Sequence, residues 1–303
     1  LVSYQMNVIF YDAMITLPLV IVYLEQLLDG EAPYPYAFVL GLTVLLQFYM
    51  GYMISIFVIL YACYYVSPRL AIEGGWKQKL KHYFQPLWKF LIYSILGVAM
   101  TSIILIPVFF NLLESKGQVA NAMTFSFAFQ INPLDILSKL SIGGFDNASG
   151  WSAGPNLPNI YIGALGFIGF IMFFASKKIL KERKIAAGVV TLIFFTSFVN
   201  EFVSKIWHMG QNPAGFFFRF SWIFSFFMLI LAYQVLKEKI EISRQGKLLA
   251  AAVLVLSAIY LYTKDFTYLP KTQPEVLTQF ITNHFVMFVV LRIIGTAAGF
   301  YLY

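Results

Sequence analysis

The chain has 303 residues, of which 60% are hydrophobic, 18% aromatic and only 12% charged, and its mean hydropathy is +0.76. A soluble domain carries about 25% charged residues, so this composition excludes a soluble globular protein and indicates a polytopic membrane protein. Three histidines and a single cysteine exclude disulfides and Cys- or His-rich metal sites, and the charge of +7 lies in short runs that are not a nucleic-acid footprint.

The first third of the chain predicts one span followed by a hairpin. An apolar stretch over residues 12–28 is long enough for a helix crossing most of a hydrocarbon core of about 30 Å. Residues 36–48 are apolar but too short to span alone, and after a break at 47–52 the apolar pattern continues over 53–66. We expect a short helical hairpin, partly buried in protein.

The middle of the chain predicts an interfacial helix, a span and a long loop. Residues 69–89 place five Lys and Arg residues among tryptophans and tyrosines, which is typical of a helix lying in the membrane interface. We expect a span over 90–113 and an extracytoplasmic loop over 114–158. Loops of that length are usually functional or disordered.

The remaining apolar runs complete an all-α, polytopic architecture of about eight membrane segments. Further spans are expected over residues 159–175, 185–206, 215–236, 248–263 and 285–303. The chain begins without Met and ends inside an apolar run. We therefore expect residues 1–303 to be a single transmembrane domain, truncated at both ends, from the middle of a longer protein.

The distribution of basic residues predicts the orientation. Three runs, 69–89, 177–184 and 237–247, hold five, five and four of the 21 Lys and Arg residues. The expected spans place all three runs on one side, which the positive-inside tendency makes cytoplasmic. Asp12 and the 114–158 loop then lie on the extracytoplasmic side.

Residues 206–227 form a polar elbow between two expected spans, and Arg219 is its most unusual residue. An arginine one turn inside an apolar helix is costly in a bilayer and is normally paired and functional. Its forked donors suit phosphate or carboxylate, and Glu201 could be its partner. Alternatively, Arg219 snorkels toward headgroups within an aromatic belt.

Other polar side chains of this elbow, and Asp12, are candidates as well. His208 could bind a diphosphate or transfer a proton, or it could only cap a helix. Gln211 and Asn212 follow it as further candidate ligand-binding residues. Asp12 could take a proton from an acceptor hydroxyl, although the helix dipole favours an N-terminal Asp whatever its function.

The long loop and the residues after it combine Asp, Asn, Trp and Gly. This combination lines many carbohydrate pockets, where sugar rings stack on indole and hydroxyls bond to amides, but it is equally typical of any turn-rich loop. The candidate sugar-binding residues are Asp146, Trp151, Asn159 and Tyr161.

Four motifs in register resemble the YfhO family of bacterial membrane proteins. They are YDA at 11–13 with LPL at 17–19, QFYMGYM at 47–53, PNIYIG at 158–163, and FRFSWIFSF at 218–226 after Trp207. That family is similar to GT-C glycosyltransferases, multi-pass helical enzymes that take a sugar from a polyprenyl-phosphate donor outside the membrane. Such members in Gram-positive bacteria are implied to decorate teichoic acids or related cell-wall polymers.

The resemblance implies a GT-C-like glycosyltransferase in the bacterial plasma membrane, with its basic loops cytoplasmic. Its partners would be membrane lipid, a polyprenyl-phosphate sugar and a cell-wall polymer acceptor, with no nucleic acid. Arg219 would hold the lipid phosphate, and Asp12 is the local candidate for the catalytic base. Family members are longer, so their main catalytic Asp is expected upstream of Leu1. No cofactor is evident, and a divalent metal is possible.

Two rival functions use the same residues. A lipid-linked sugar or polysaccharide transporter or flippase would use the same pocket without cleaving a bond. Transporters often carry repeats and discontinuous helices in both halves, whereas this sequence shows one broken hairpin at 36–66. The other rival is a non-catalytic partner in a cell-wall assembly.

Overall fold

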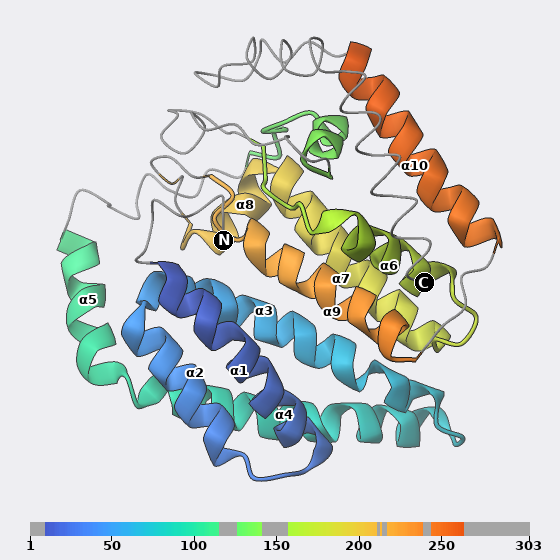
Figure 1. The fold of residues 1–303 in the computed structure, drawn as a ribbon. Helices are drawn as coiled ribbons and strands as arrows, with labels where there is room; N and C mark the ends of the chain where they lie inside the picture. Colours follow the sequence, from blue (N-terminus) through green and yellow to red (C-terminus); the bar gives the residue numbers. More distant parts are fainter. Residues whose placement is uncertain are drawn as a thin grey trace. The chain divides into compact units, whose positions relative to one another are not determined.

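The computed structural model describes residues 10–114, 126–140, 157–210, 213, 217–238 and 244–263. Within these ranges the chain forms ten α-helices and two 3-10 helices. The only β-type pairing among them is an isolated bridge between Phe129 and Asn200 (Figure 1). The predicted all-α class is therefore confirmed for the described part of the chain.

The chain divides into two compact units. Unit 1 comprises residues 1–125, 180–193 and 205–211, and unit 2 comprises residues 126–179, 194–204 and 212–303. The predicted single transmembrane domain stays a prediction.

Unit 1 begins with α1 (Tyr11–Asp29), which matches the predicted first span. Its buried face follows a helical repeat through Leu17, Val20 and Leu24, each at 0% exposure. The helix ends at Gly30, whose φ of 98° is left-handed, a conformation that glycine adopts without a Cβ clash.

The predicted hairpin consists of α2 (Tyr34–Leu46) and α3 (Phe48–Val66). The break is a single residue, Gln47, at φ −150° and ψ 88°, so the expected break over 47–52 was too long. Gly51 lies inside α3. Only a glycine fits at this position, because a Cβ there would come within 2.8 Å of the Cα of Val44. This glycine permits close packing of α3 on α2 and does not end the helix.

Two side-chain hydrogen bonds show that α1 and α3 run parallel. Tyr61 Oη donates to Glu25 Oε1, and one turn later Tyr65 Oη donates to Asp29 Oδ2 over 2.8 Å. Both pairs are 36 residues apart. The same offset brings Asp12, at the start of α1, to the level of Phe48, at the start of α3.

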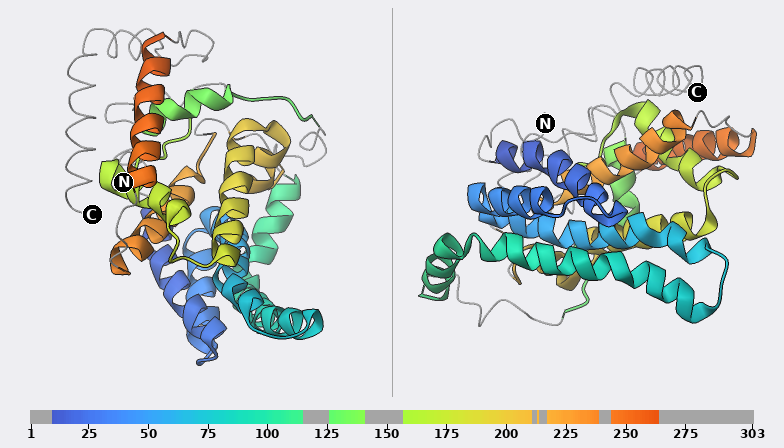
Figure 2. Two further views of the ribbon diagram at one scale, coloured as in Figure 1. Left: turned by 90° about the vertical axis from the view of Figure 1, so that its right-hand side faces the viewer. Right: turned by 90° about the horizontal axis from the view of Figure 1, so that it is seen from below.

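The next helix joins two elements that the sequence pattern separated. After the 3-10 helix η3 (Ser67–Ala71), α4 runs without interruption over Trp76–Ala99, so the expected boundary between an interfacial helix and a span at residue 90 is wrong. The chain then turns by 70° into α5, which covers Ser102–Glu114. Figure 2 shows this bend at the end of α4.

α2 and α4 approach each other through small residues. A Cβ added to Gly97 would lie 2.5 Å from the carbonyl oxygen of Ala37, and one added to Gly41 would lie 2.7 Å from the carbonyl oxygen of Gly97. Close backbone approach through small residues is a common packing mode of membrane helices. Tyr36 Oη and Ser94 Oγ add a hydrogen bond of 2.8 Å beside this crossing.

Unit 2 contains one 3-10 helix and three complete α-helices: η5 (Pro133–Leu140), α6 (Gly163–Ala175), α9 (Ser221–Lys237) and α10 (Arg244–Thr263). Two more helices, α7 (Lys181–Val199) and α8 (Glu201–Trp207), are shared between the units. α6 packs on α9, where Phe170 meets Phe224 edge to face. Because α7 ends at Val199 and α8 begins at Glu201, the expected span over 185–206 is interrupted at Asn200.

Two described helices, Tyr11–Asp29 and Phe48–Ala71, are long and apolar enough to cross a membrane, and the bent pair α4–α5 is a third candidate. The apolar helices α2, α6 and α9 are shorter. The count of about eight membrane segments and the GT-C arrangement therefore stay predictions. The last expected span, 285–303, lies outside the described residues.

Candidate functional site

His208 is held by α3 in unit 1. Its ring is 3% exposed, its Nδ1 lies 2.5 Å from Tyr49 Oη, and the two rings stack with centroids 6.1 Å apart. One turn further along α3, Tyr52 Oη donates to the carbonyl oxygen of Ile206 over 2.8 Å. The first two turns of α3 thus fix the position of this histidine.

The backbone beside His208 is strained. Met209 has φ 55° and Gly210 has φ 83°, so two consecutive residues are left-handed after α8. The amide groups of His208 and Gly210 both donate to the carbonyl oxygen of Lys205, at 3.0 and 2.8 Å, which satisfies the helix end. A non-glycine residue in this conformation costs about 1–2 kcal/mol, and such strain is concentrated at functional sites.

Asp12 lies at the same end of unit 1 as this histidine. Its side chain is exposed in the first turn of α1, and the parallel register of α1 and α3 brings it to the level of Phe48, next to Tyr49. An exposed carboxylate and a buried, hydrogen-bonded imidazole therefore share one end of unit 1, which we call the acid–histidine end.

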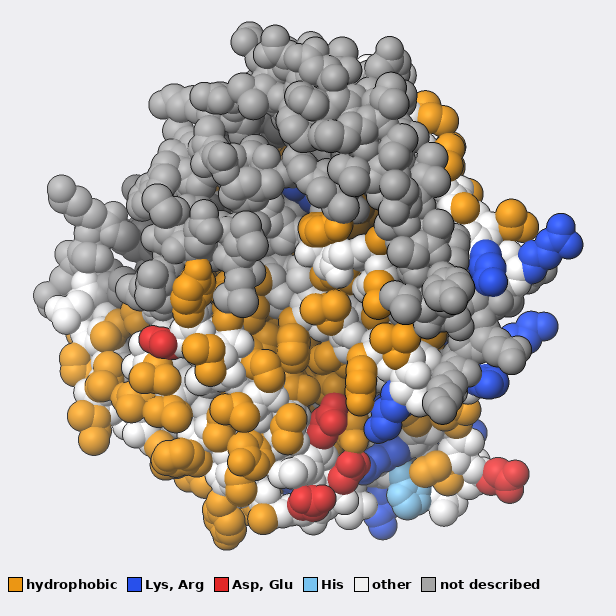
Figure 3. All heavy atoms as spheres, viewed as in Figure 1, with side chains coloured by type: hydrophobic (Ala, Val, Ile, Leu, Met, Phe, Trp, Pro, Cys, Tyr) orange, Lys and Arg blue, Asp and Glu red, His pale blue; other side chains and the backbone are white. Residues whose placement is uncertain are grey.

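The opposite end of unit 1 collects charged side chains. Arg69 Nη2 lies 3.9 Å from Asp29 Oδ1, and Asp29 also accepts the hydrogen bond from Tyr65. Arg183 covers the rings of Tyr64 and Tyr65, with its Cζ 5.6 and 5.9 Å from their centroids. Arg69 and Arg183 come from the first and second basic runs, so one residue of each run lies at this end of unit 1. The placement of the runs on one side of the membrane stays a prediction. In Figure 3 hydrophobic side chains cover α1 and α2, and charged ones gather beyond the C-terminal end of α1.

In unit 2, Arg219 lies in a turn before α9 and not one turn inside a helix, which corrects the expectation from the apolar run. The turn covers 217–220, and α9 begins only at Ser221 because Phe220 is its N-cap. Arg219 is half-buried. Its neighbours Phe218 and Phe220 are buried and pack on Phe198, with centroid distances of 5.8 and 5.2 Å.

Glu201 is the first residue of α8 and also belongs to unit 2. Its amide donates to the carbonyl oxygen of Ala128 over 3.1 Å, and the amide of Gln130 donates to Val199 over 2.8 Å. A short piece of the predicted long loop therefore pairs with the α7–α8 junction. Glu201 and Arg219 are both half-buried, and their pairing stays a prediction.

Two of the expected sugar-binding residues lie in the segment that precedes α6. Asn159 is half-buried and Tyr161 is 44% exposed. The other four candidates, Asp146, Trp151, Gln211 and Asn212, lie outside the described residues.

Sequence reasoning missed a buried charged group in unit 2. Asp135 and Lys139, both in η5, are 0% and 2% exposed, and Tyr260 Oη from α10 donates to Asp135 Oδ1 over 2.5 Å. The loop 114–158 therefore contains an ordered element that α10 holds. The signal was the amphipathic sequence PLDILSKL within an otherwise polar stretch. Among the described residues no cluster of three or more His, Cys, Asp or Glu side chains could hold a metal, and a divalent metal stays a prediction.

The sequence pattern of the bacterial membrane protein YfhO family matches residues 1–299, which is nearly the whole chain. The chain belongs to the YfhO family. This membership confirms the resemblance read from the four motifs and makes the chain a bacterial membrane protein. No curated protein and no solved structure gives a match, so the chemistry of this YfhO-family chain must be argued from its own residues.

Proposed function

We propose that this YfhO-family chain is part of a glycosyltransferase of the bacterial plasma membrane, and that it moves a sugar from a polyprenyl-phosphate donor to a cell-wall polymer such as teichoic acid. One observation carries the proposal: Asp12 and the Tyr49–His208 pair share one end of unit 1, while residues of two basic runs meet at the other end. If the basic end is cytoplasmic, the acid–histidine end faces the cell wall.

In the proposed reaction Asp12 acts as the general base. An acceptor hydroxyl oxygen attacks the anomeric carbon of the donor sugar while its proton passes to the Asp12 carboxylate. The bond between the anomeric carbon and the donor phosphate oxygen breaks, and polyprenyl phosphate leaves with the electron pair. The exposure of Asp12 in the first turn of α1 suits this role, because a large polymer acceptor must reach it from outside.

The leaving phosphate needs positive charge and hydrogen-bond donors. Arg219 lies in the turn that leads into α9, so it combines a guanidinium with the positive end of a helix dipole. In unit 1, His208, which Tyr49 orients through Nδ1, is a separate candidate donor. Asn159 and Tyr161, together with Asp146, Trp151, Gln211, Asn212 and Glu201, are proposed to bind the sugar and acceptor.

A transporter is the second candidate, and one observation favours it. Among the described helices of unit 1, α4 and α5 form a bent pair, with a turn of 70° between them. Discontinuous helices are frequent at the substrate sites of transporters. Such a protein would move the lipid-linked sugar across the membrane and leave the sugar–phosphate bond intact.

The two candidates separate in one experiment. Membranes containing the full-length protein are incubated with a radiolabelled polyprenyl-phosphate sugar and cell-wall polymer, and labelled polymer and released polyprenyl phosphate are both measured. A glycosyltransferase yields the two products in equal amounts, and Arg219→Ala and Asp12→Ala lose both at unchanged expression. Movement of intact lipid-linked sugar across vesicles, without either product, would establish the transporter instead.

A further inference from the structure

The exposed face of α4 changes character along its length. Lys77 and Lys81 are exposed near its N-terminus, and an apolar stripe follows at helical spacing. Its members Phe84, Trp88 and Ile95 are 56%, 66% and 61% exposed. The opposite face, through Phe90 and Gly97, is buried inside unit 1. A cationic start followed by an apolar stripe matches one lipid molecule, with its headgroup at one end and an acyl chain at the other.

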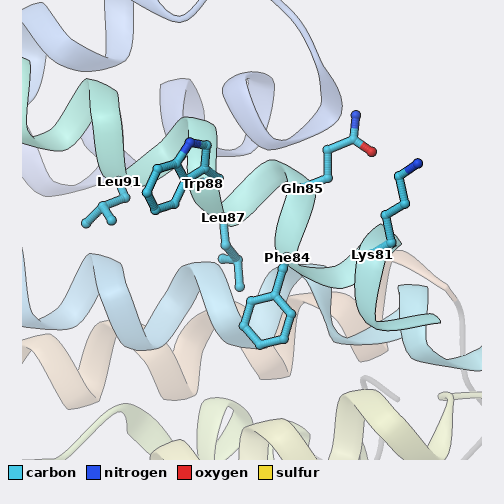
Figure 4. A pocket seen from close by; sticks show the side chains of 6 residues that line it. All are labelled: Lys81, Phe84, Gln85, Leu87, Trp88 and Leu91. Carbon is cyan, nitrogen blue, oxygen red and sulfur yellow. The ribbon is translucent and has the colours of Figure 1, made fainter. Parts of the chain in front are cut away.

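A hollow of about 580 Å³ lies on this face. The described residues that line it all belong to α4: Lys81, Phe84, Gln85, Leu87, Trp88 and Leu91. Figure 4 shows Lys81 and Gln85 projecting to one side of the helix, with Phe84 and Leu87 on the other side. The hollow therefore offers a cation and an amide beside a mostly apolar surface.

The charge of α4 selects among lipids. The helix carries four lysines and no Asp or Glu, and the nearest acidic residue before it in the chain is Glu73. Lysines close to a membrane surface attract anionic headgroups, and each lysine makes the free energy of binding more favourable. Zwitterionic lipids, whose headgroups have no net charge, would gain little from the same lysines.

This part of α4 lies at the basic end of unit 1. Tyr83 Oη donates to the carbonyl oxygen of Cys63 over 3.4 Å, which brings the first half of α4 beside the C-terminal part of α3. The same part of α3 carries Tyr64 and Tyr65, under Arg183. The hollow is thus remote from the acid–histidine end, where a polyprenyl-phosphate donor would bind.

We propose that this hollow of α4 binds one anionic glycerophospholipid, with the phosphate on Lys81 and Gln85 and an acyl chain along Phe84, Trp88 and Leu91. The occupant is a bilayer lipid because the cationic positions of α4 come first and the apolar ones follow along the same helix. This order matches the headgroup and the acyl chain of one lipid molecule. This inference is independent of the proposed transferase activity.

The test uses Trp88 as a reporter in the full chain, reconstituted in phosphatidylcholine vesicles. A small fraction of the lipid is replaced by brominated phosphatidylglycerol or brominated phosphatidylcholine, which quench nearby tryptophans. The contribution of Trp88 is the difference between the wild type and Trp88→Phe. We expect stronger quenching by the anionic lipid, and Lys81→Gln reduces that preference about fivefold. At 1 M salt the Debye length is about 3 Å, so the preference shrinks.

Lys89→Gln is the matched control, because Lys89 is exposed on the same helix but does not line the hollow; it should retain most of the preference. Thermal unfolding in detergent verifies that the variants fold. Equal quenching by the two brominated lipids in the wild type would overturn the proposal, as would a preference that Lys81→Gln leaves unchanged. Stronger quenching by a brominated polyprenyl phosphate than by phosphatidylglycerol would overturn it too.

Discussion

Tyr49 and His208, 159 residues apart in the chain, form a stacked pair whose Oη and Nδ1 atoms lie 2.5 Å apart. The contact fixes the imidazole at a helix end whose next residue, Met209, has a strained φ of 55°. A helix could end there without strain if residue 209 were glycine. The backbone instead adopts a costly conformation directly after a histidine that α3 orients.

Removing the Tyr49 hydroxyl tests the role of this pair. Tyr49→Phe keeps the ring stack and loses the hydrogen bond, so the free energy of unfolding should fall by about 1 kcal/mol. Under the proposed function we also expect sugar transfer to fall about tenfold, because the imidazole loses the partner that orients it. Tyr52→Phe is the control, since it loses a comparable hydrogen bond to Ile206. Equal effects of both variants on transfer would reduce Tyr49 to a structural role.

Substitution of Arg219 tests the phosphate site. Arg219→Ala should lower turnover of the polyprenyl-phosphate donor about a hundredfold, because charge-assisted hydrogen bonds contribute about 1.5–3 kcal/mol. Arg219→Lys should recover only part of it, since lysine lacks the planar fork. Steady-state kinetics on reconstituted protein measures both. Arg244→Ala, an exposed arginine at the start of α10, should leave turnover unchanged. Normal turnover in a folded Arg219→Ala protein would remove the assignment.

The α2–α4 crossing predicts a large effect of a single methyl group. In Gly97→Ala the new Cβ would lie 2.5 Å from the carbonyl oxygen of Ala37, and a backbone atom cannot move aside cheaply. We expect a loss of about 1–3 kcal/mol in the free energy of unfolding, measured by denaturant or thermal unfolding in detergent. Gly75→Ala is the control. Gly75 precedes the same helix, and a Cβ added there would meet nothing within 4 Å. If both substitutions have the same small effect, the close crossing does not exist.

The arginine above two tyrosine rings predicts a stability effect at the basic end. Arg183→Met keeps an apolar stem but loses the cation, and should cost about 0.5–2 kcal/mol. Lys181→Met removes an exposed charge from the same turn of α7 and should change stability by less than about 0.5 kcal/mol. Unfolding of both variants is compared in the same detergent. If Arg183→Met leaves the free energy of unfolding unchanged, the contact of Arg183 with the two rings contributes nothing to the packing of α7.

Much of the fold followed from apolar periodicity, and the errors came from residues with two possible roles. α1 and the hairpin were predicted because uninterrupted apolar runs end at polar turns. Gly51 was taken as part of a break, although it serves close packing against Val44. The boundary at residue 90 failed because a basic amphipathic segment and an apolar one can share one straight helix. Only tertiary contacts distinguish these cases.

The candidate site was predicted less completely than the fold. His208 and Asp12 were chosen as unusual polar residues, and the structure brings them to one end of unit 1. Their relation to Tyr49 could not be predicted, because it depends on a contact between segments more than 150 residues apart. Asp135 was missed since a lone Asp in a long loop looks solvated until Tyr260 is placed against it.

The most direct measurement compares Asp12→Asn with Asp29→Asn in the full-length protein. Both replace an exposed carboxylate on α1, one at each end of the helix, and the released polyprenyl phosphate is followed from a radiolabelled donor in reconstituted vesicles. If the acid–histidine end performs the chemistry, Asp12→Asn lowers release at least about a hundredfold, while Asp29→Asn retains it. Equal release by the two variants, with both proteins folded, would contradict the assignment of the chemistry to that end.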